Sequence, residues 1–138
     1  MEPHTQVGIG ILVIRDGKIL LGQRKGSHGA GEFGGTGGHL EYMESIIECA
    51  KRETLEEAGI TIKNIRLLCV GNVKRYAPKH YLEIGLIADW ESGEPVVIEP
   101  NKVESWNWHD PNDMPSPLMA GMSEYITAYK GGENLFDE

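Results

Sequence analysis

Three glutamates within one turn of a predicted helix have the spacing to present their carboxylates together. At 100° per residue, Glu56 lies about −60° and Glu57 about +40° from Glu53, so all three share one stripe of the helix surface. A separate stripe collects the residues expected to face a core: Ile47, Ala50, Thr54 and Ala58. Carboxylate oxygens are the ligands that hard divalent cations such as Mg²⁺ and Mn²⁺ prefer. The pattern therefore predicts a helix over residues 44–58 with a metal-binding edge.

One arginine lies beside this acidic stripe. Arg52 is four residues from both Glu48 and Glu56, so it can pair with Glu56 and reduce repulsion between like charges. A solvated surface face crossed by ion pairs is the alternative interpretation of such a helix. Two features favour a ligand site instead: the cations are too few to neutralise the carboxylates, and a glycine-rich segment comes immediately before the helix.

That segment has an unusual composition. Between Gly22 and Gly38, eight of 17 residues are glycine, and Arg24, Lys25 and His28 lie among them. Glycines let the backbone approach a ligand closely, and a cation beside them can bind a phosphate. Ordinary surface cations are the alternative for both basic residues, and more so for Lys25.

The spacing of the glycine, arginine and glutamates resembles the Nudix box, Gly-x5-Glu-x7-Arg-Glu-U-x-Glu-Glu-x-Gly-U, in which U is bulky and apolar. All seven fixed positions match: Gly38, Glu44, Arg52, Glu53, Glu56, Glu57 and Gly59. At average composition, chance gives this match about 4 × 10⁻⁹ times per window. Segments 20–31, 37–41, 99–102 and 106–108 are also similar to MutT-type members, so the resemblance covers nearly the whole chain.

Family members cleave a nucleoside diphosphate linked to another group and use Mg²⁺ or Mn²⁺. The resemblance implies an α/β fold, an α/β/α sandwich with a mixed sheet, in a single Nudix domain over residues 1–138. MutT-type members hydrolyse nucleoside triphosphates, sometimes oxidised ones, so the resemblance implies release of a nucleoside monophosphate and pyrophosphate. Two alternatives remain: hydrolysis of a nucleoside-diphosphate derivative such as ADP-ribose or a nucleotide sugar, and nucleotide binding without turnover.

By position, the resemblance assigns the metal ligands to the carboxylates of Glu53, Glu56 and Glu57 and to the backbone carbonyl of Gly37. Glu99 matches, with a small gap, a family glutamate that approaches the metals or the attacking water. We favour Glu53 as the group that accepts the proton, with Glu99 second.

The resemblance gives the other two charged box residues, Glu44 and Arg52, the role of supporting the loop and the helix. Five side chains are predicted to contact the substrate: Arg24, Lys25, His39, Leu118 and Met119. His39 flanks the glycine-rich segment and could contact a phosphate, although a solvent-facing loop histidine is equally consistent. Leu118 and Met119 fall where family members often recognise the base, and core packing is the alternative.

Three positions depart from the family pattern. Gly35-Thr36 stands where Leu-Pro is common, Met43 replaces a common glycine, and Thr54 fills an apolar slot. Loss of the proline predicts a looser loop. No carboxylate is lost, so we expect metal binding to be retained.

The remaining sequence predicts the elements that position these residues. Two strands, 7–14 and 18–24, join across Asp16-Gly17, a strong hairpin signal. Further strands are expected at 60–73, 81–90, 96–98 and 106–108. Ser116 and Pro117 fit the cap and first position of a final helix that continues to residue 129. Strands and two helices in this order suggest a sheet between helices.

Composition limits the partners. The 138 residues include 13 Lys and Arg against 21 Asp and Glu, a net charge of −8, which opposes binding of a nucleic acid polymer but not of a small phosphorylated ligand with a metal. The longest apolar run, 7–14, is too short to span a membrane, and residues 1–6 lack a secretory signal. Cys49 and Cys69 are expected to be reduced thiols in a cytoplasmic protein. Relatives often dimerise, which makes a homodimer an expectation by analogy.

Overall fold

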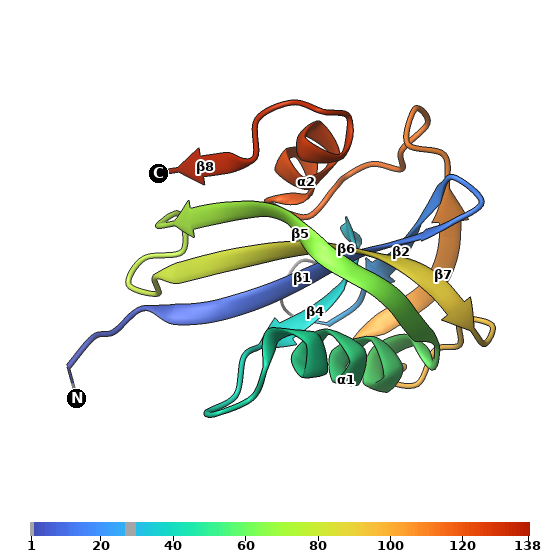
Figure 1. The fold of residues 1–138 in the computed structure, drawn as a ribbon, viewed down its shortest axis with the longest axis horizontal. Coiled ribbons are helices and arrows are strands. Elements are labelled where there is room, and N and C mark those ends of the chain that lie inside the picture. Colours follow the sequence, from blue (N-terminus) through green and yellow to red (C-terminus); the bar gives the residue numbers. More distant parts are fainter. Residues whose placement is uncertain (1, 27–29) are drawn as a thin grey trace.

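A mixed β-sheet lies between two helices in the computed structural model, which describes residues 2–26 and 30–138 (Figure 1). The strands are β1 Gln6–Arg15, β2 Lys18–Arg24, β3 Phe33–Gly34, β4 Thr36–His39, β5 Thr61–Val73, β6 Tyr81–Ser92, β7 Val103–His109 and β8 Leu135–Asp137. Helix α1, Ile46–Ala58, covers one face and helix α2, Met122–Tyr129, covers the other. This confirms the predicted α/β/α sandwich. His28, noted in the glycine-rich segment, lies outside the described residues.

The strand order in the described part of the chain is β3-β2-β1-β6-β5-β8, with β4 also pairing with β1 and β7 with β2. The pair β1–β6 is parallel and joins Gly8 to Glu83 and Gly10 to Gly85. The hairpin β1–β2 turns at Asp16 and Gly17, whose φ angles of 52° and 75° are those of the predicted tight turn. No helix in the residues that the structure describes is long and apolar enough to cross a bilayer.

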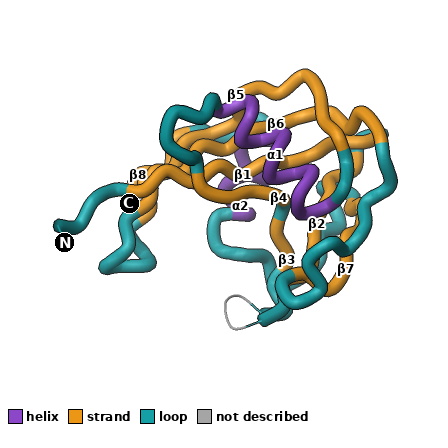
Figure 2. Tube along the Cα trace, turned by 90° about the horizontal axis from the view of Figure 1, so that it is seen from below, coloured by secondary structure: helices purple, strands orange, loops and turns teal. Residues whose placement is uncertain are grey.

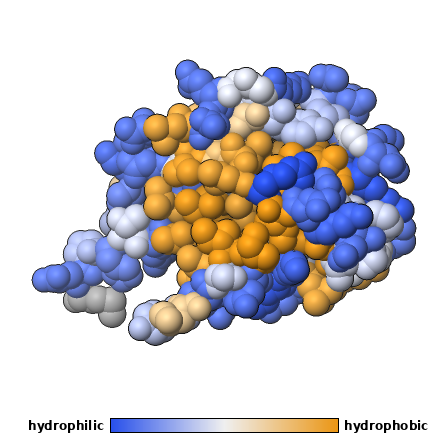
Figure 3. All heavy atoms as spheres, in the orientation of Figure 1, coloured by the Kyte–Doolittle hydropathy of each residue, from blue (hydrophilic) through white to orange (hydrophobic). Residues whose placement is uncertain are grey.

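Alternation along β1 divides the core into two layers. Ile9, Ile11 and Val13 pack toward α1, while Leu12 packs with Tyr125 and other α2 residues on the opposite side. Seen from the α1 side, the helix runs across β1, β4 and β6 (Figure 2). In the orientation of Figure 1, apolar residues gather over the middle of the visible face, and Leu67 of β5 is 66% exposed (Figure 3).

Helix α1 begins and ends at specific caps. The Ser45 hydroxyl accepts a hydrogen bond from the Glu48 amide at 3.0 Å, and Gly59 ends the helix at φ 72° with its amide bonded to the Leu55 carbonyl. The predicted core stripe is confirmed for Ala50, Thr54 and Ala58, but Ile47 is 43% exposed. Cys49, one turn before Glu53, is fully buried instead of Ile47.

Two predicted elements are wrong. Residues 96–98 form no strand: the Val96 amide bonds the Ala58 carbonyl, which holds this segment against the end of α1. The final helix begins at Met122, not at Pro117, because Pro117 and Met119 exchange backbone hydrogen bonds with Phe33 and are therefore extended. The strand expected at 106–108 is part of the longer β7.

Two departures from the box pattern contact each other. The hydroxyls of Thr36 and Thr54 form a hydrogen bond of 2.9 Å, and both residues are buried. Thr36 also pairs with Ile11 in the sheet, so the loop expected to be loose is an ordered strand. The third departure, Met43, has a φ of 67°, a left-handed conformation that explains why glycine is common there.

We expect the threonine pair to behave as a unit. Thr54→Val should destabilise the protein by about 1–3 kcal/mol, because it leaves the buried Thr36 hydroxyl without a partner. Thr36→Val combined with Thr54→Val should cost less than either single change, since no polar group is then left unpaired. Urea unfolding of the four proteins measures this coupling, and strictly additive losses would contradict it.

Candidate active site

The acidic stripe of α1 differs in burial from one carboxylate to the next. The side chain of Glu53 is 16% exposed and that of Glu56 is 57% exposed. Burial is the main cause that raises the pKa of Glu57 from 4.5 to about 7. Burial also raises the pKa of Glu53. The helix therefore holds two of its three predicted metal ligands partly out of water, where their negative charge is costly.

Arg52 connects the stripe to the preceding loop. Its guanidinium contacts Glu44 at 2.7 and 3.0 Å, Glu53 at 2.8 Å, and Glu56 at 3.4 Å. Hydrogen bonding from Arg52 lowers the pKa of Glu44 to about 2. Glu41, which the sequence analysis did not single out, lies 3.7 Å from the same guanidinium. These contacts join the loop before α1 to the helix, and the supporting role of Glu44 and Arg52 stays a prediction.

Glycines of β4 make room for the carboxylates. The Gly37 amide donates to Glu57 Oε2 at 2.9 Å, and a Cβ on Gly38 would overlap the Glu53 carboxylate. On the other side, Trp106 Nε1 donates to the Glu57 carbonyl oxygen at 3.1 Å and fixes the end of the helix. The strand and the acidic edge of α1 thus fit together only because β4 lacks side chains here.

The charges around Glu57 leave an excess of negative charge. After burial, Glu53 and Glu99 raise its pKa further, whereas the Gly37 amide and Arg24 lower it. Glu99 therefore belongs to the same electrostatic group, and it also forms an ion pair with Lys102 at 3.1 Å. Arg24 Nε is buried and has no hydrogen-bond partner among the described residues. A buried guanidinium nitrogen without a partner is a typical contact point for an anion.

A cavity of about 330 Å³ opens on the α2 side of β4 and β1. Arg24, Gly37, His39 and Met119 line it, so the structure brings four predicted site residues together there. Lys25 is exposed beside this group, and Leu118 packs with the α2 layer of the core. The His39 ring stacks on Tyr81 with centroids 5.7 Å apart.

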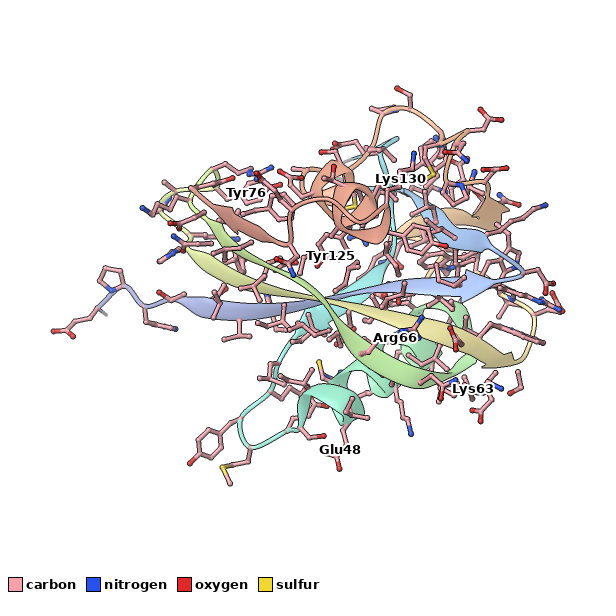
Figure 4. All side chains as sticks on the ribbon, turned by 45° about the horizontal axis from the view of Figure 1, so that its top comes forward. Glu48, Lys63, Arg66, Tyr76, Tyr125 and Lys130 are labelled. Atoms are coloured by element: carbon pink, nitrogen blue, oxygen red, sulfur yellow. The ribbon has the colours of Figure 1, made fainter. Side chains whose placement is uncertain are left out.

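Sequence reasoning missed the far end of this cavity. Arg75, Tyr76, Glu83 and Tyr125 also line it. Figure 4 shows Tyr125 between α2 and the sheet and Tyr76 in the loop beyond β5. One signal was present in the sequence: Glu83 is a lone acid in the otherwise apolar first half of the strand 81–90.

The residues present fit a hard divalent cation by their chemistry. Glu53, Glu56, Glu57 and Glu99 supply carboxylate oxygens, the Gly37 backbone adds a carbonyl, and the buried members lack enough cations to balance them. As they stand, no three His, Cys, Asp or Glu side chains of the described residues are grouped closely enough to hold an ion. In this arrangement the Arg52 guanidinium donates hydrogen bonds to the carboxylates of Glu53 and Glu56.

Comparison with known proteins places this chain and its fold in a family. The family model of the NUDIX domain matches residues 4–129. An oxidized purine nucleoside triphosphate hydrolase of Danio rerio is 32% identical over 112 residues, which are 79% of this chain and 69% of that protein. The NAD-capped RNA hydrolase NudC of Pseudomonas putida is 33% identical over 121 residues, 88% of this chain, but the chain spans only 42% of that relative's length.

Solved structures of NUDIX proteins share this fold. The MutT NUDIX hydrolase from Burkholderia pseudomallei superposes with a TM-score of 0.84 at 34% identity, covering 91% of this chain and 98% of that one. The NUDIX domain of Shewanella oneidensis NrtR, solved with ADP ribose, has a TM-score of 0.75 at 21% identity and covers 93% of this chain and 88% of that one, which shows the shared fold. The chain belongs to the Nudix family and is a MutT-like pyrophosphohydrolase of phosphoanhydride bonds in nucleotide derivatives. Nudix hydrolases generally use divalent cations.

The raised pKa of Glu57 predicts a pH dependence of stability. A carboxyl whose pKa is higher in the folded than in the unfolded state stabilises the fold most when it is protonated. Its contribution is complete below about 4.5 and is lost as the pH rises through about 7. Without divalent ions, Glu57→Gln should therefore stabilise the protein relative to wild type by about 3 kcal/mol at pH 8 and by little at pH 4.

Urea unfolding in a chelator at both pH values measures this difference. The control is Glu48→Gln on the outer side of α1, whose side chain points away from the sheet (Figure 4). A Glu57→Gln effect that does not grow with pH would contradict the buried, undercompensated carboxylate.

Proposed function

We propose that the protein hydrolyses a nucleoside triphosphate, ordinary or oxidised, to a nucleoside monophosphate and pyrophosphate. One observation carries this: a buried group of carboxylates around Glu57 lies behind β4, and Arg24, with its unpartnered Nε, faces the cavity on the other side. Carboxylates that can hold a metal and a cation that can bind a phosphate thus lie on the two sides of the β4 glycines. The name of the Danio rerio relative supports this substrate class.

In this proposal Glu53, Glu56 and Glu57, the Gly37 carbonyl and Glu99 hold Mg²⁺ or Mn²⁺. The bound ion supplies neutralisation of phosphate charge and a lowered pKa of coordinated water. Arg24 binds a phosphate oxygen through its Nε–H, with the exposed Lys25 and the cavity-lining His39 beside it.

Glu53 accepts the proton of the attacking water, with Glu99 as the second candidate. The support for Glu53 is its raised pKa, which makes it a better base than an ordinary glutamate, and its position against Gly38 at the edge of β4. Arg52 holds Glu53 and Glu44 in place and keeps the loop against the helix.

The predicted small-molecule partner and the predicted cellular location also have physical support. A net charge of −8 favours a small nucleotide over a nucleic acid polymer as the partner. Burial raises the pKa of Cys49 to about 12 and that of Cys69 to about 11, so both are protonated thiols at neutral pH. Both are free, which supports a cytoplasmic location.

Substitution of single carboxylates tests the assignment. Glu53→Gln and Glu56→Gln should each lower turnover at least about 100-fold, because each removes a proton acceptor or a metal ligand. Glu48→Gln, on the same helix but facing away from the site, should leave turnover unchanged (Figure 4). Rates with saturating Mg²⁺ and circular dichroism of each variant separate lost chemistry from lost folding. Near-normal rates in both site variants would refute these roles.

The products identify the substrate class. The protein is incubated with Mg²⁺ and with ordinary or oxidised nucleoside triphosphates, ADP-ribose, nucleotide sugars or dinucleoside polyphosphates, and the products are separated. Pyrophosphate from a triphosphate is the expected result. A sugar phosphate from ADP-ribose or a nucleotide sugar would replace the triphosphate proposal with that of a diphosphate derivative. Metal-dependent binding without any product would indicate a nucleotide-binding module.

A further inference from the structure

One glutamate outside the proposed chemistry is held beside the loop 74–79, where the chain leaves β5. Strand β8 pairs in parallel with the end of β5, and Figure 1 shows the two strands alongside each other. The Glu138 amide donates to the Asn72 carbonyl oxygen at 3.1 Å, and Asn72 Nδ2 donates to Asp137 Oδ1 at 3.0 Å. These bonds fix the backbone from which the Glu138 side chain projects.

The two carboxylate oxygens of Glu138 have different partners. Oε1 accepts hydrogen bonds from the backbone amides of Lys74 at 2.7 Å and Arg75 at 3.0 Å. Oε2 accepts from Arg75 Nε at 2.6 Å and also contacts a terminal nitrogen of the same guanidinium. These donors, the Lys74 amide first, lower the pKa of the Glu138 carboxyl. One ionised side chain therefore holds both the backbone and a side chain at the start of the loop, through hydrogen bonds that its charge strengthens.

Arg75 extends this connection to α2. Its guanidinium also contacts Glu124 Oε1 at 3.3 Å, and Glu124 lies in the first turn of α2. The three side chains are only 27–34% exposed. Isolated surface ion pairs contribute little, whereas a network that shares one well-oriented arginine contributes more. The arginine thus joins β8, the loop beyond β5 and the final helix.

The loop 74–79 forms part of the cavity wall. Three of its side chains line the cavity: Arg75, Tyr76 and Lys79. Inside the loop, the Ala77 amide donates to the Lys74 carbonyl oxygen at 3.1 Å, and the Lys79 amide donates to the Tyr76 carbonyl oxygen at 3.0 Å. These turn bonds shape the loop, and the bonds to Glu138 attach its beginning to β8. A wall that is already ordered does not add an ordering cost to the binding of a ligand.

We propose that Glu138 is a positioning residue for substrate binding, which holds the loop 74–79 in the conformation that lines the cavity before a ligand arrives. This step rests on the proposed function, in which the nucleotide enters the cavity with its phosphates at Arg24. The carboxylate group around Glu57 lies on the other side of the β4 glycines. The loop therefore contributes to the affinity for the nucleotide and not to the chemical step, and without Glu138 part of the binding energy is used to order it.

Steady-state kinetics with Mg²⁺ and each of the four ordinary nucleoside triphosphates test this. For the triphosphate with the highest turnover, Glu138→Ala should raise KM about 10-fold and leave kcat within about 3-fold, because the loop binds the ground state and the transition state equally. Glu138→Gln keeps one oxygen for the backbone amides and should raise KM by about 3-fold. The matched control, Glu133→Ala, removes an exposed carboxylate just before β8 and should change neither value.

Hydrogen exchange separates positioning from loss of the fold. In Glu138→Ala the amides of Lys74 and Arg75 should exchange at least about 10-fold faster than in wild type, while the amides of α1 keep their protection. Faster exchange at the two loop amides with an unchanged KM overturns the inference, as does a kcat that falls as much as KM rises, or the same KM increase in Glu133→Ala. If α1 also loses protection, Glu138→Gln decides, and an unchanged KM in that variant overturns the inference.

A separate measurement covers failure of the proposed function. If no triphosphate is hydrolysed, that function is refuted, and calorimetry with the same four nucleotides in a chelator decides the role of Glu138. About 10-fold weaker binding to Glu138→Ala than to wild type supports the role. Equal affinity, or no binding to either protein, overturns it.

Discussion

Repulsion between carboxylates is the constraint around which this molecule is built. Glu53, Glu56 and Glu57 are held on neighbouring turns of one helix, and the fold places part of this charge out of water. Arg52 offsets some of the repulsion by binding Glu44, Glu53 and Glu56 at once. It does not offset it near Glu57, where Glu53 and Glu99 add further negative charge. The fold therefore gives up stability to keep these carboxylates together.

Residues around the carboxylates hold α1 against the sheet despite this repulsion. The glycines of β4 let the strand approach α1, and the Gly37 amide supplies one of the few donors to the buried charge. Trp106 fixes the end of the helix from β7. The hydroxyl pair of Thr36 and Thr54 joins the same strand and helix at their buried faces. Each contact fixes the distance between the acidic edge and the sheet, on which any shared metal geometry depends.

The sequence predicted the parts of this design that have a local signature. The box spacing located the helix and its acidic edge, and Asp16-Gly17 located the hairpin, because periodicity and turn chemistry act over a few residues. Long-range contacts set the rest. Pro117 and Leu118 are extended because Phe33 pairs with this segment, and the Thr36–Thr54 bond joins positions 18 residues apart. Periodicity could not single out Glu83, because the space for its side chain depends on Gly8, on a strand 75 positions earlier.

The parallel pairing of β1 with β6 also affects how the chain is made. During synthesis, β1 and β2 leave the ribosome long before residues 81–92 exist, and the inner edge of β1 has no partner in that interval. At ordinary translation speeds of about 5–20 residues per second, the wait is roughly 4 to 15 seconds. An apolar strand with an open edge is prone to associate with other chains. Nascent chains of this protein are therefore expected to need chaperone protection until the sixth strand emerges.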